Sequence, residues 1–168
     1  MRDFNEINIK DIKINPFEEI GNSWMLITAK KESEVNTMTA SWGALGIMWG
    51  KPVSFIGIRP QRYTKKFVDY SDNFSICFFD GNYKEKLEYL GKVSGKNENK
   101  IDKSGLTLID YNNVPIFAET KLALICKKLY SQELDSNCFI EKNLDNIWYK
   151  NKDYHTMYIS EIITVIEK

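Results

Sequence analysis

Histidine is almost absent from this sequence, and cysteine is scarce and widely spaced. The 168-residue chain holds one histidine, His155, and three cysteines, Cys77, Cys126 and Cys138. Because there is no Cys-x-x-Cys pair and no second histidine, the sequence argues against a zinc site and against a metal-binding role for His155. Cys77 and Cys126 sit inside apolar runs, which is typical of buried thiols in a reducing compartment.

The sequence also lacks a net charge and long apolar runs. Its 23 basic and 23 acidic side chains cancel, whereas a nucleic-acid-binding domain usually carries a basic excess. No apolar run approaches the ~20 residues of a membrane-spanning helix. The charged start, MRDFNEINIKDIKINPF, has no apolar core of the kind found in signal peptides. We therefore expect a cytoplasmic protein that binds neither nucleic acid nor a membrane.

Familiar nucleotide-binding and hydrolase motifs are missing too. The chain has no GxGxxG, the glycine-rich turn that places a dinucleotide on a Rossmann fold. It has no GxxxxGK(S/T), which excludes a P-loop. It also has no GxSxG, and no Ser-His-Asp set can be placed. These absences argue against three large enzyme classes.

The chain does contain a series of short β-rich segments. Most are apolar, rich in β-branched or aromatic residues, and bounded by charge, proline or glycine, which is the signature of strands. The segment 121–134 fits a strand or a helix, and its alternating Leu122, Leu124 and Cys126 favour a strand. The predicted strands are Ser23–Lys31, Val35–Ala40, Pro52–Pro60, Asn73–Asp80, Leu106–Asp110, Pro115–Phe117, Lys121–Leu134 and Tyr154–Glu167.

Helical spacing is confined to short segments. Tyr63, Phe67 and Tyr70 recur as on one face of a helix, and a second short helix around Leu87 is predicted to end at Gly91 as its C′ residue. Strands dominate without a regular βαβ alternation, so we expect a mainly β chain with a closed or sandwiched sheet. Residues 1–168 are expected to form one domain.

The stretch NTMTASWGALGIMWGKPVSFIGIRPQRYT, residues 36–64, is free of Asp and Glu. Thr39, Ser41 and Gly43 follow a predicted strand, where small residues leave backbone groups open to a ligand. Trp42 and Trp49 offer flat aromatic faces. This composition indicates a binding site for a ligand with polar, apolar and anionic parts.

The end of this stretch, RPQRYT, joins a strand to a helix. Arg59 and Arg62 supply positive charge, Tyr63 and Thr64 supply hydroxyls, and a helix N-terminus supplies free N–H groups. Together these features suit a phosphate. The alternative is that Thr64 is an ordinary N-cap and that both arginines are solvated.

Two further segments carry polar groups that suit a ligand. Ser94, Gly95 and Lys96 in SGKNENK have the composition of an anion-binding loop, although a solvated surface loop is the alternative. His155 in DYHTMYISEI is the one side chain whose unperturbed pKa lies near neutrality. A packed residue in a strand is the alternative for His155.

The segments NTMTASWGALGIMWGKPVSFIGIRPQRYT, FSICFF, YLGKVSGKNENK and DYHTMYISEI, in this order, resemble the flavin reductase family. The flavoredoxin-like branch is the most similar, and the resemblance runs from Trp24 to Ile166. It implies an FMN-binding split β-barrel of Greek-key type with a few short helices. It also implies a homodimer with FMN at the interface.

The resemblance carries functional residues over to this chain. Ser160 stands where family members often have a glycine, which is the one departure. The residues expected to line the flavin are Thr39, Ala40, Ser41 and Trp42. Those expected near its phosphate and ribityl chain are Arg59, Gln61, Arg62, Tyr63, Thr64, Ser94, Gly95 and Lys96. His155 is expected near the reactive face of the ring.

The implied activity is an NAD(P)H-dependent reductase. NADH or NADPH would pass a hydride to FMN, and the electrons would go on to a small-molecule acceptor. FMN is expected rather than FAD because no Rossmann fingerprint is present for an ADP half. The alternatives are an electron-transfer flavoprotein that serves a protein partner and a non-catalytic FMN-binding protein.

Overall fold

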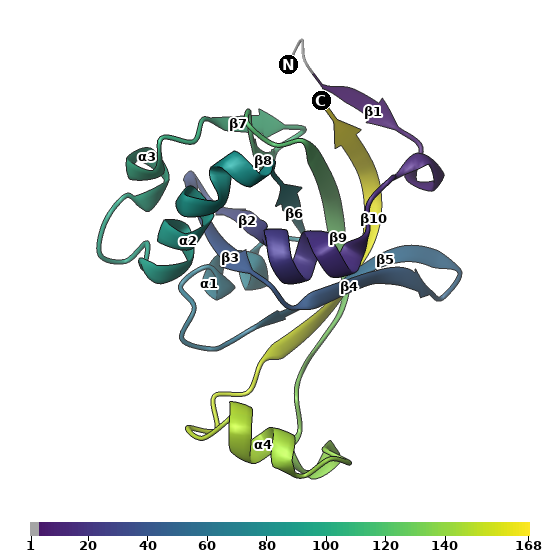
Figure 1. Cartoon of the computed structure of the whole chain (residues 1–168), viewed down its shortest axis with the longest axis vertical. Coiled ribbons are helices and arrows are strands. Elements are labelled where there is room, and N and C mark those ends of the chain that lie inside the picture. Colours follow the sequence, from purple (N-terminus) through teal and green to yellow (C-terminus); the bar gives the residue numbers. More distant parts are fainter. Residues whose placement is uncertain (1–3) are drawn as a thin grey trace.

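A computed structural model describes residues 4–168, and its central element is one curved antiparallel sheet with the order β3-β2-β6-β9-β10-β5-β4 (Figure 1). The first strand, β1, pairs with β10 outside this path. The strands of this sheet are β1 (Asn5–Ile7), β2 (Met25–Lys31), β3 (Glu34–Ala40), β4 (Gly43–Met48), β5 (Lys51–Ile58), β6 (Asn73–Phe78), β9 (Leu122–Glu133) and β10 (Thr156–Glu167). A separate hairpin joins β7 (Leu108–Tyr111) to β8 (Val114–Phe117).

The central strands bury both of their faces. In β2, Met25 and Ile27 pack into the cluster inside the curved sheet, whereas Leu26 packs into a second cluster on the other face. The same division separates Leu124 from Ala123 in β9. Burial on both sides explains why these strands are continuous apolar runs rather than clean alternations of polar and apolar residues.

The helices are short, and all but α4 pack on one of these two clusters or its edge. Phe67 and Val68 of α1 are buried in the inner cluster, and Leu87 and Leu90 of α2 in the second. The helices are α1 (Lys65–Tyr70), α2 (Lys84–Lys92), α3 (Lys100–Ser104) and α4 (Asn143–Trp148), with the 3-10 turns Ile9–Asp11, Gly81–Tyr83 and Ser136–Cys138 and a π-helical segment Phe17–Ser23.

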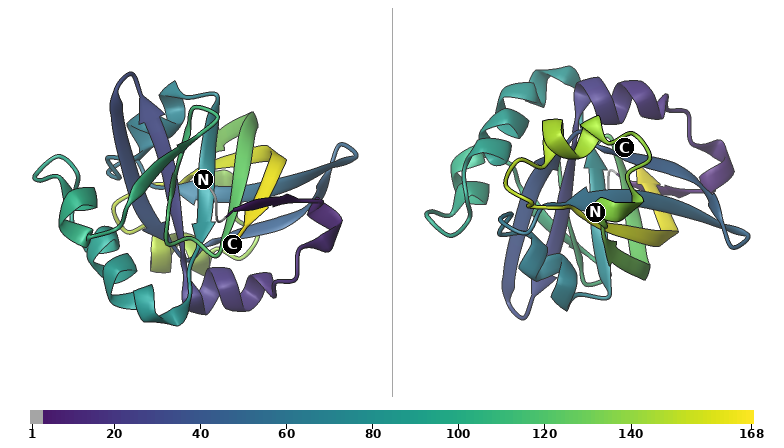
Figure 2. Two further views of the ribbon diagram at one scale, coloured as in Figure 1. Left: turned by 90° about the horizontal axis from the view of Figure 1, so that it is seen from above. Right: turned by 90° about the horizontal axis from the view of Figure 1, so that it is seen from below.

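Two parts of the chain project from the barrel. The β4–β5 hairpin extends to one side in all views (Figures 1 and 2). The chain between the end of β9 and the start of β10 carries α4 and lies below the barrel in the view of Figure 1. We call this connection, residues 134–155, the α4 segment.

The structure confirms the mainly β prediction and each predicted strand, with shifts of a few residues at the ends. It adds two strands, β1 and β4, that the sequence did not predict. The sequence of β4, GALGIM, holds two glycines, which weaken strand propensity. Its pairing with β5 is secured by a two-residue turn, Trp49 and Gly50, with φ of 51° and 69°.

The predicted role of Gly91 is wrong. This residue lies inside α2, which continues to Lys92 and is followed by Val93 as its C-cap. A Cβ at position 91 would lie 3.2 Å from the Cβ of Thr39. Glycine therefore stands here because α2 packs closely against β3, and not because the helix ends.

Candidate functional site

A cavity of about 280 Å³ opens where β3 and β5 end and β10 is about to begin. Its walls contain no carboxylate, so nothing at its surface repels an anion. Seven of the residues singled out in the sequence meet here. The lining residues are Met38, Thr39, Ala40, Ser41, Trp42, Gly57, Arg59, Arg62 and His155.

Gly57 in β5 keeps one wall of the cavity open. A Cβ at this position would lie 3.1 Å from the sulfur of Met157 and 3.3 Å from Cδ2 of His155. His155 and Met157 therefore flank the glycine on one face. His155 itself is the residue before β10 begins, rather than a member of the strand.

Arg62 is fixed by backbone carbonyl groups. Its Nη1 donates to the Gly91 carbonyl at 3.0 Å, and its Nη2 approaches the Thr39 carbonyl at 3.5 Å. Burial lowers the pKa of the guanidinium, but arginine remains charged at every physiological pH. The cavity therefore has a permanent, half-buried positive charge with no carboxylate bound to it among the residues that the structure describes.

A second cation, Lys100, lies close to Arg62. Its ammonium donates to the Leu90 carbonyl at 2.8 Å and to the Val93 carbonyl at 3.0 Å, and the residue is 4% exposed. Burial, and then the charge of Arg62, lower the pKa of Lys100 to about 8. Two cations that repel each other in a partly dry environment favour an anion between or beside them.

Arg59 is engaged differently. Its Nη1 donates to Oδ2 of Asp153 at 2.6 Å, and its Nη2 donates to the Trp148 carbonyl at 2.9 Å. Gln61 donates to the same Asp153 oxygen at 2.7 Å. These two hydrogen bonds, from Arg59 and then Gln61, lower the pKa of Asp153. The charge of Arg59 is thus already balanced within the chain.

Aromatic rings form the outer wall. Trp42 meets Trp148 edge to face with 4.9 Å between ring centroids, and it lies 5.1 Å from the imidazole of His155. Trp42 is 42% exposed. A flat apolar ring could therefore pack against it from the open side of the cavity.

His155 is buried and neutral. Burial, and then the charge of Arg59, lower its pKa to about 4, although Asp153 acts in the opposite direction. The Tyr149 hydroxyl lies 2.7 Å from Nδ1 of the imidazole. At neutral pH the imidazole can form a hydrogen bond with a ligand, but it carries no charge.

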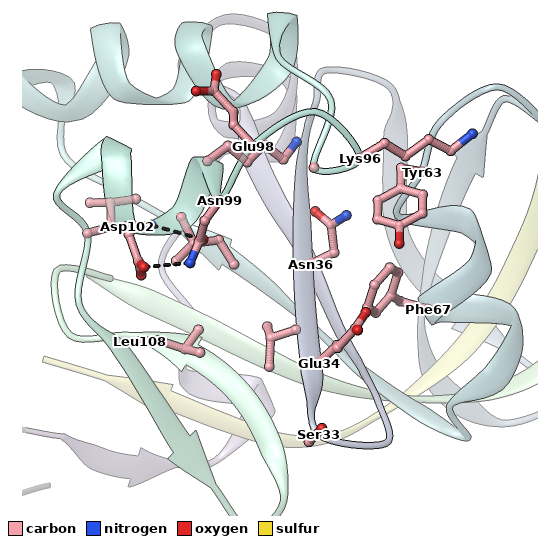
Figure 3. Close-up of a pocket in the computed structure, with 15 residues that line it drawn as sticks. Ser33, Glu34, Asn36, Tyr63, Phe67, Lys96, Glu98, Asn99, Asp102 and Leu108 are labelled. Atoms are coloured by element: carbon pink, nitrogen blue, oxygen red, sulfur yellow. Dashed lines mark hydrogen bonds between the residues drawn. The ribbon is translucent and has the colours of Figure 1, made fainter.

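A larger cavity of about 540 Å³ lies beside the loop that follows α2 (Figure 3). Tyr63 and Lys96 line it, with the Lys96 ammonium 5.7 Å from the centre of the Tyr63 ring. Asn36 of β3 is 3% exposed, and its Oδ1 accepts from the Thr37 N–H at 2.7 Å. Its Nδ2 forms no hydrogen bond within residues 4–168 and packs against Gly95. Amide, hydroxyl and ammonium donors thus gather at one side of this cavity.

Three predicted residues lie outside both linings. Gln61 is bound to Asp153, Thr64 donates to the Thr37 carbonyl at 3.0 Å, and Ser94 accepts from the Lys96 N–H at 3.3 Å. Thr64 is therefore neither a ligand-facing hydroxyl nor a side-chain cap.

The expectation of free N–H groups at the start of α1 is wrong. The N–H of Lys65 donates to the Arg62 carbonyl, and that of Lys66 donates to the Tyr63 carbonyl. The helix is only six residues long, and the turn before it already binds the backbone N–H groups that a phosphate would need.

The structure also adds residues that the sequence did not single out. Asn36 opens the quoted acid-free stretch and Lys100 closes SGKNENK, so both were within reach of motif reading. Tyr149 carried no such signal, because nothing local relates it to His155. Within residues 4–168, no group of three or more His, Cys, Asp or Glu side chains could hold a metal ion. Over the same range no helix has the length and apolar character needed to cross a membrane, and the cytoplasmic location stays a prediction.

The sequence matches the flavin reductase-like domain family over residues 17–167. The chain belongs to this family. An uncharacterized protein from Aeropyrum pernix is 29% identical over 103 residues, which is 60% of this chain. The chain spans only 39% of the length of that relative.

Solved structures share the fold. An FMN-binding domain of a flavin reductase-like enzyme from Shewanella baltica OS155 has a TM-score of 0.72 and 17% identity, over 98% of this chain and 77% of that chain. Flavoredoxin from Desulfovibrio vulgaris (Miyazaki F) has a TM-score of 0.67 and 24% identity, over 86% and 69%. An NADH:FAD oxidoreductase from Streptomyces globisporus C-1027 has a TM-score of 0.66 and 14% identity, over 87% and 74%. The predicted fold, that of the FMN-binding split barrels, is thus confirmed.

Proposed function

We propose that this flavin reductase-like domain binds FMN and transfers a hydride to it from NADH or NADPH, after which the electrons pass to a small-molecule acceptor. The observation that carries the proposal is the cavity at the ends of β3 and β5. It brings an exposed tryptophan, a half-buried arginine and a neutral histidine to one opening. Membership of the flavin reductase-like family supports it.

The residues present fit FMN. Its ring system is flat, with apolar faces and a polar edge. The indole of Trp42 suits an apolar face, and the backbone polar groups around Ser41 suit the polar edge. Its phosphate is a dianion, and Arg62 with Lys100 supplies two cations. Asn36, Tyr63 and Lys96 add donors at one side of the larger cavity, whose lining also holds the carboxylates of Glu34, Glu98 and Asp102. We therefore place the phosphate end between these donors and Arg62, and not deeper in the larger cavity.

Each of these residues has a separate task. Trp42 packs on the ring and keeps water from one side, Arg62 and Lys100 hold the phosphate, and His155 offers a neutral imidazole at the cavity wall. FMN supplies the redox chemistry, since its ring accepts a hydride and carries electrons. The protein therefore needs to orient the ring and leave one of its faces open. Hydride transfer does not require His155 to be protonated and act as an acid.

A homodimer is part of the proposal. Large apolar side chains are exposed on both projections of the barrel, where Ile47 is 73% and Trp49 58% exposed on the hairpin side, and Ile140 100% and Ile147 59% in the α4 segment. Exposed apolar groups of this size mark interaction surfaces. A second copy of the chain would cover them and complete the wall of the cavity.

The test begins with the chromophore. The purified protein, reconstituted if necessary, is expected to show a flavin absorbance spectrum, and mass spectrometry of the heat-released compound is expected to find FMN. Anaerobic mixing with NADH or NADPH should then bleach the flavin. A flavin that stays oxidised with both donors would favour an electron-transfer or non-catalytic role, and a chain that takes up no flavin would refute the proposal altogether.

A further inference from the structure

The one histidine of the chain is held by a tyrosine from the α4 segment. The Tyr149 hydroxyl and Nδ1 of His155 are 2.7 Å apart, and the rings meet edge to face at 5.6 Å between centroids. Tyr149 is 4% and His155 8% exposed, so water does not compete freely for this hydrogen bond. Nε2 of His155 forms no hydrogen bond within the described residues, and the side chain lines the cavity.

The direction of this hydrogen bond follows from counting protons. Within residues 4–168, the only partner of the Tyr149 hydroxyl is Nδ1. Burial raises the pKa of Tyr149, so the phenol keeps its proton. If Nδ1 also carried a proton, the phenol hydrogen would lack an acceptor in a buried place, which is costly. The phenol therefore donates, Nδ1 accepts, and the imidazole proton resides on Nε2.

Tyr149 is itself held firmly. The Arg59 guanidinium lies 5.3 Å from the centre of its ring, and Tyr154 stacks on it at 4.9 Å between centroids. Arg59 is fixed in turn by Asp153. The charged groups nearest the imidazole, Arg59 and Asp153, are thus paired with each other, and the tyrosine has little freedom to turn away.

We propose that Tyr149 is a positioning residue that holds His155 as the neutral tautomer with its proton on Nε2, and so presents a fixed hydrogen-bond donor to the cavity. A ligand atom opposite Nε2 must then be an acceptor, such as a carbonyl oxygen. The use of this donor on a flavin or nicotinamide rests on the function proposed above, but the tautomer does not.

The single histidine makes a direct test possible. With histidine labelled by the spin-active nitrogen isotope, the imidazole of the full-length chain gives one set of nitrogen resonances that identify the protonated atom. We expect a proton on Nε2, an Nδ1 resonance typical of a hydrogen-bond acceptor, and no titration around neutral pH. Tyr149→Phe should shift the Nδ1 resonance toward that of an unbonded nitrogen.

The matched control is Tyr154→Phe. Tyr154 stacks on Tyr149 but donates its hydroxyl to Asp145 at 2.7 Å, so its loss should leave the imidazole resonances as in the wild type. A proton on Nδ1 in the wild type would overturn the inference. An Nδ1 resonance that is unchanged by Tyr149→Phe would overturn it equally.

A second arm separates this inference from the proposed function. In FMN-loaded protein, Tyr149→Phe should slow flavin reduction by NADH or NADPH about tenfold while Tyr154→Phe keeps the wild-type rate. If the chain takes up no flavin, the proposed function fails and the nitrogen resonances still decide the tautomer. If flavin binds and the imidazole proton is on Nδ1, the inference fails alone.

Discussion

Gly95 packs so closely against Asn36 that a Cβ at position 95 would lie 2.5 Å from the side-chain nitrogen of Asn36. The loop after α2 therefore lies directly against β3, at the side of the larger cavity where the Asn36 side-chain nitrogen has no hydrogen-bond partner within residues 4–168. Glycine at position 95 therefore lets the loop lie against β3 without displacing the side-chain nitrogen of Asn36, which is a hydrogen-bond donor.

Gly95→Ala is expected to displace the Asn36 amide and to weaken FMN binding about tenfold, which corresponds to the loss of about one hydrogen bond. Fluorescence titration of the apoprotein with FMN measures this. Gly81→Ala is the control, because nothing lies within 4 Å of a Cβ there. Equal FMN affinity in the two variants would show that the loop does not contribute to the phosphate end.

The two arginines of RPQRYT are expected to differ. Arg62→Ala removes a half-buried charge that no carboxylate balances, and should weaken FMN binding by roughly 1.5–3 kcal/mol. Arg59→Ala should affect binding less, because its guanidinium is already paired with Asp153. It should instead lower the melting temperature, since Asp153 loses its partner in a half-buried place. The reverse order of FMN affinities would place the phosphate next to Arg59.

Acid should destabilise the protein through His155. The pKa of His155 is lowered from 6.5 to about 4 by burial and by Arg59, so the unfolded chain takes up the proton first as the pH falls. Stability is therefore full above about pH 6.5 and decreases toward pH 4, by an amount on the order of 3 kcal/mol. In His155→Gln the titrating group is gone, and urea unfolding over this range should show a flatter pH dependence. Parallel curves for the two proteins would contradict the low pKa.

Charge placed on the α4 segment should weaken the proposed dimer. Ile140 is fully exposed, so Ile140→Glu should leave the folded chain unchanged but shift sedimentation toward half the mass. Ile163→Glu is the control, since Ile163 is 46% exposed and lies at the bulge of β10 between Ile162 and Thr164, outside the α4 segment. A wild-type chain that sediments as a monomer at micromolar concentration would count against the dimer, and so would equal dissociation in the two variants.

The strands that could be predicted from the sequence are those whose own residues are apolar and β-prone because both faces of the strand are buried. Leu124 and Ile125 in β9 face opposite buried clusters, so the run is apolar throughout and easily recognised. In β4, by contrast, Gly43 and Gly46 weaken the local signal, and the strand exists because β5 offers it a hydrogen-bonding edge. A tertiary cause of this kind leaves no periodicity in the sequence.

The residues of the site also divide into those that the sequence could indicate and those that only the structure shows. Trp42, Arg62 and His155 fell within recognisable motifs, and the structure brings them to one cavity. The ion pair of Arg59 with Asp153 joins residues 94 positions apart. No spacing rule predicts such a contact, so the sequence could assign a charge to Arg59 but could not show that the charge is already paired.

The α4 segment has a consequence for how this domain could be altered. It supplies the Trp148 carbonyl, the Tyr149 hydroxyl and the Asp153 carboxylate to the region around the cavity, yet it contributes no strand within the barrel. One side of the cavity is therefore encoded outside the barrel strands, although Thr39, Ala40 and Gly57 of its lining belong to β3 and β5. Exchanging residues 134–155 for a segment of different sequence would remodel what the cavity accepts while the hydrogen-bond ladder of the barrel stays as it is.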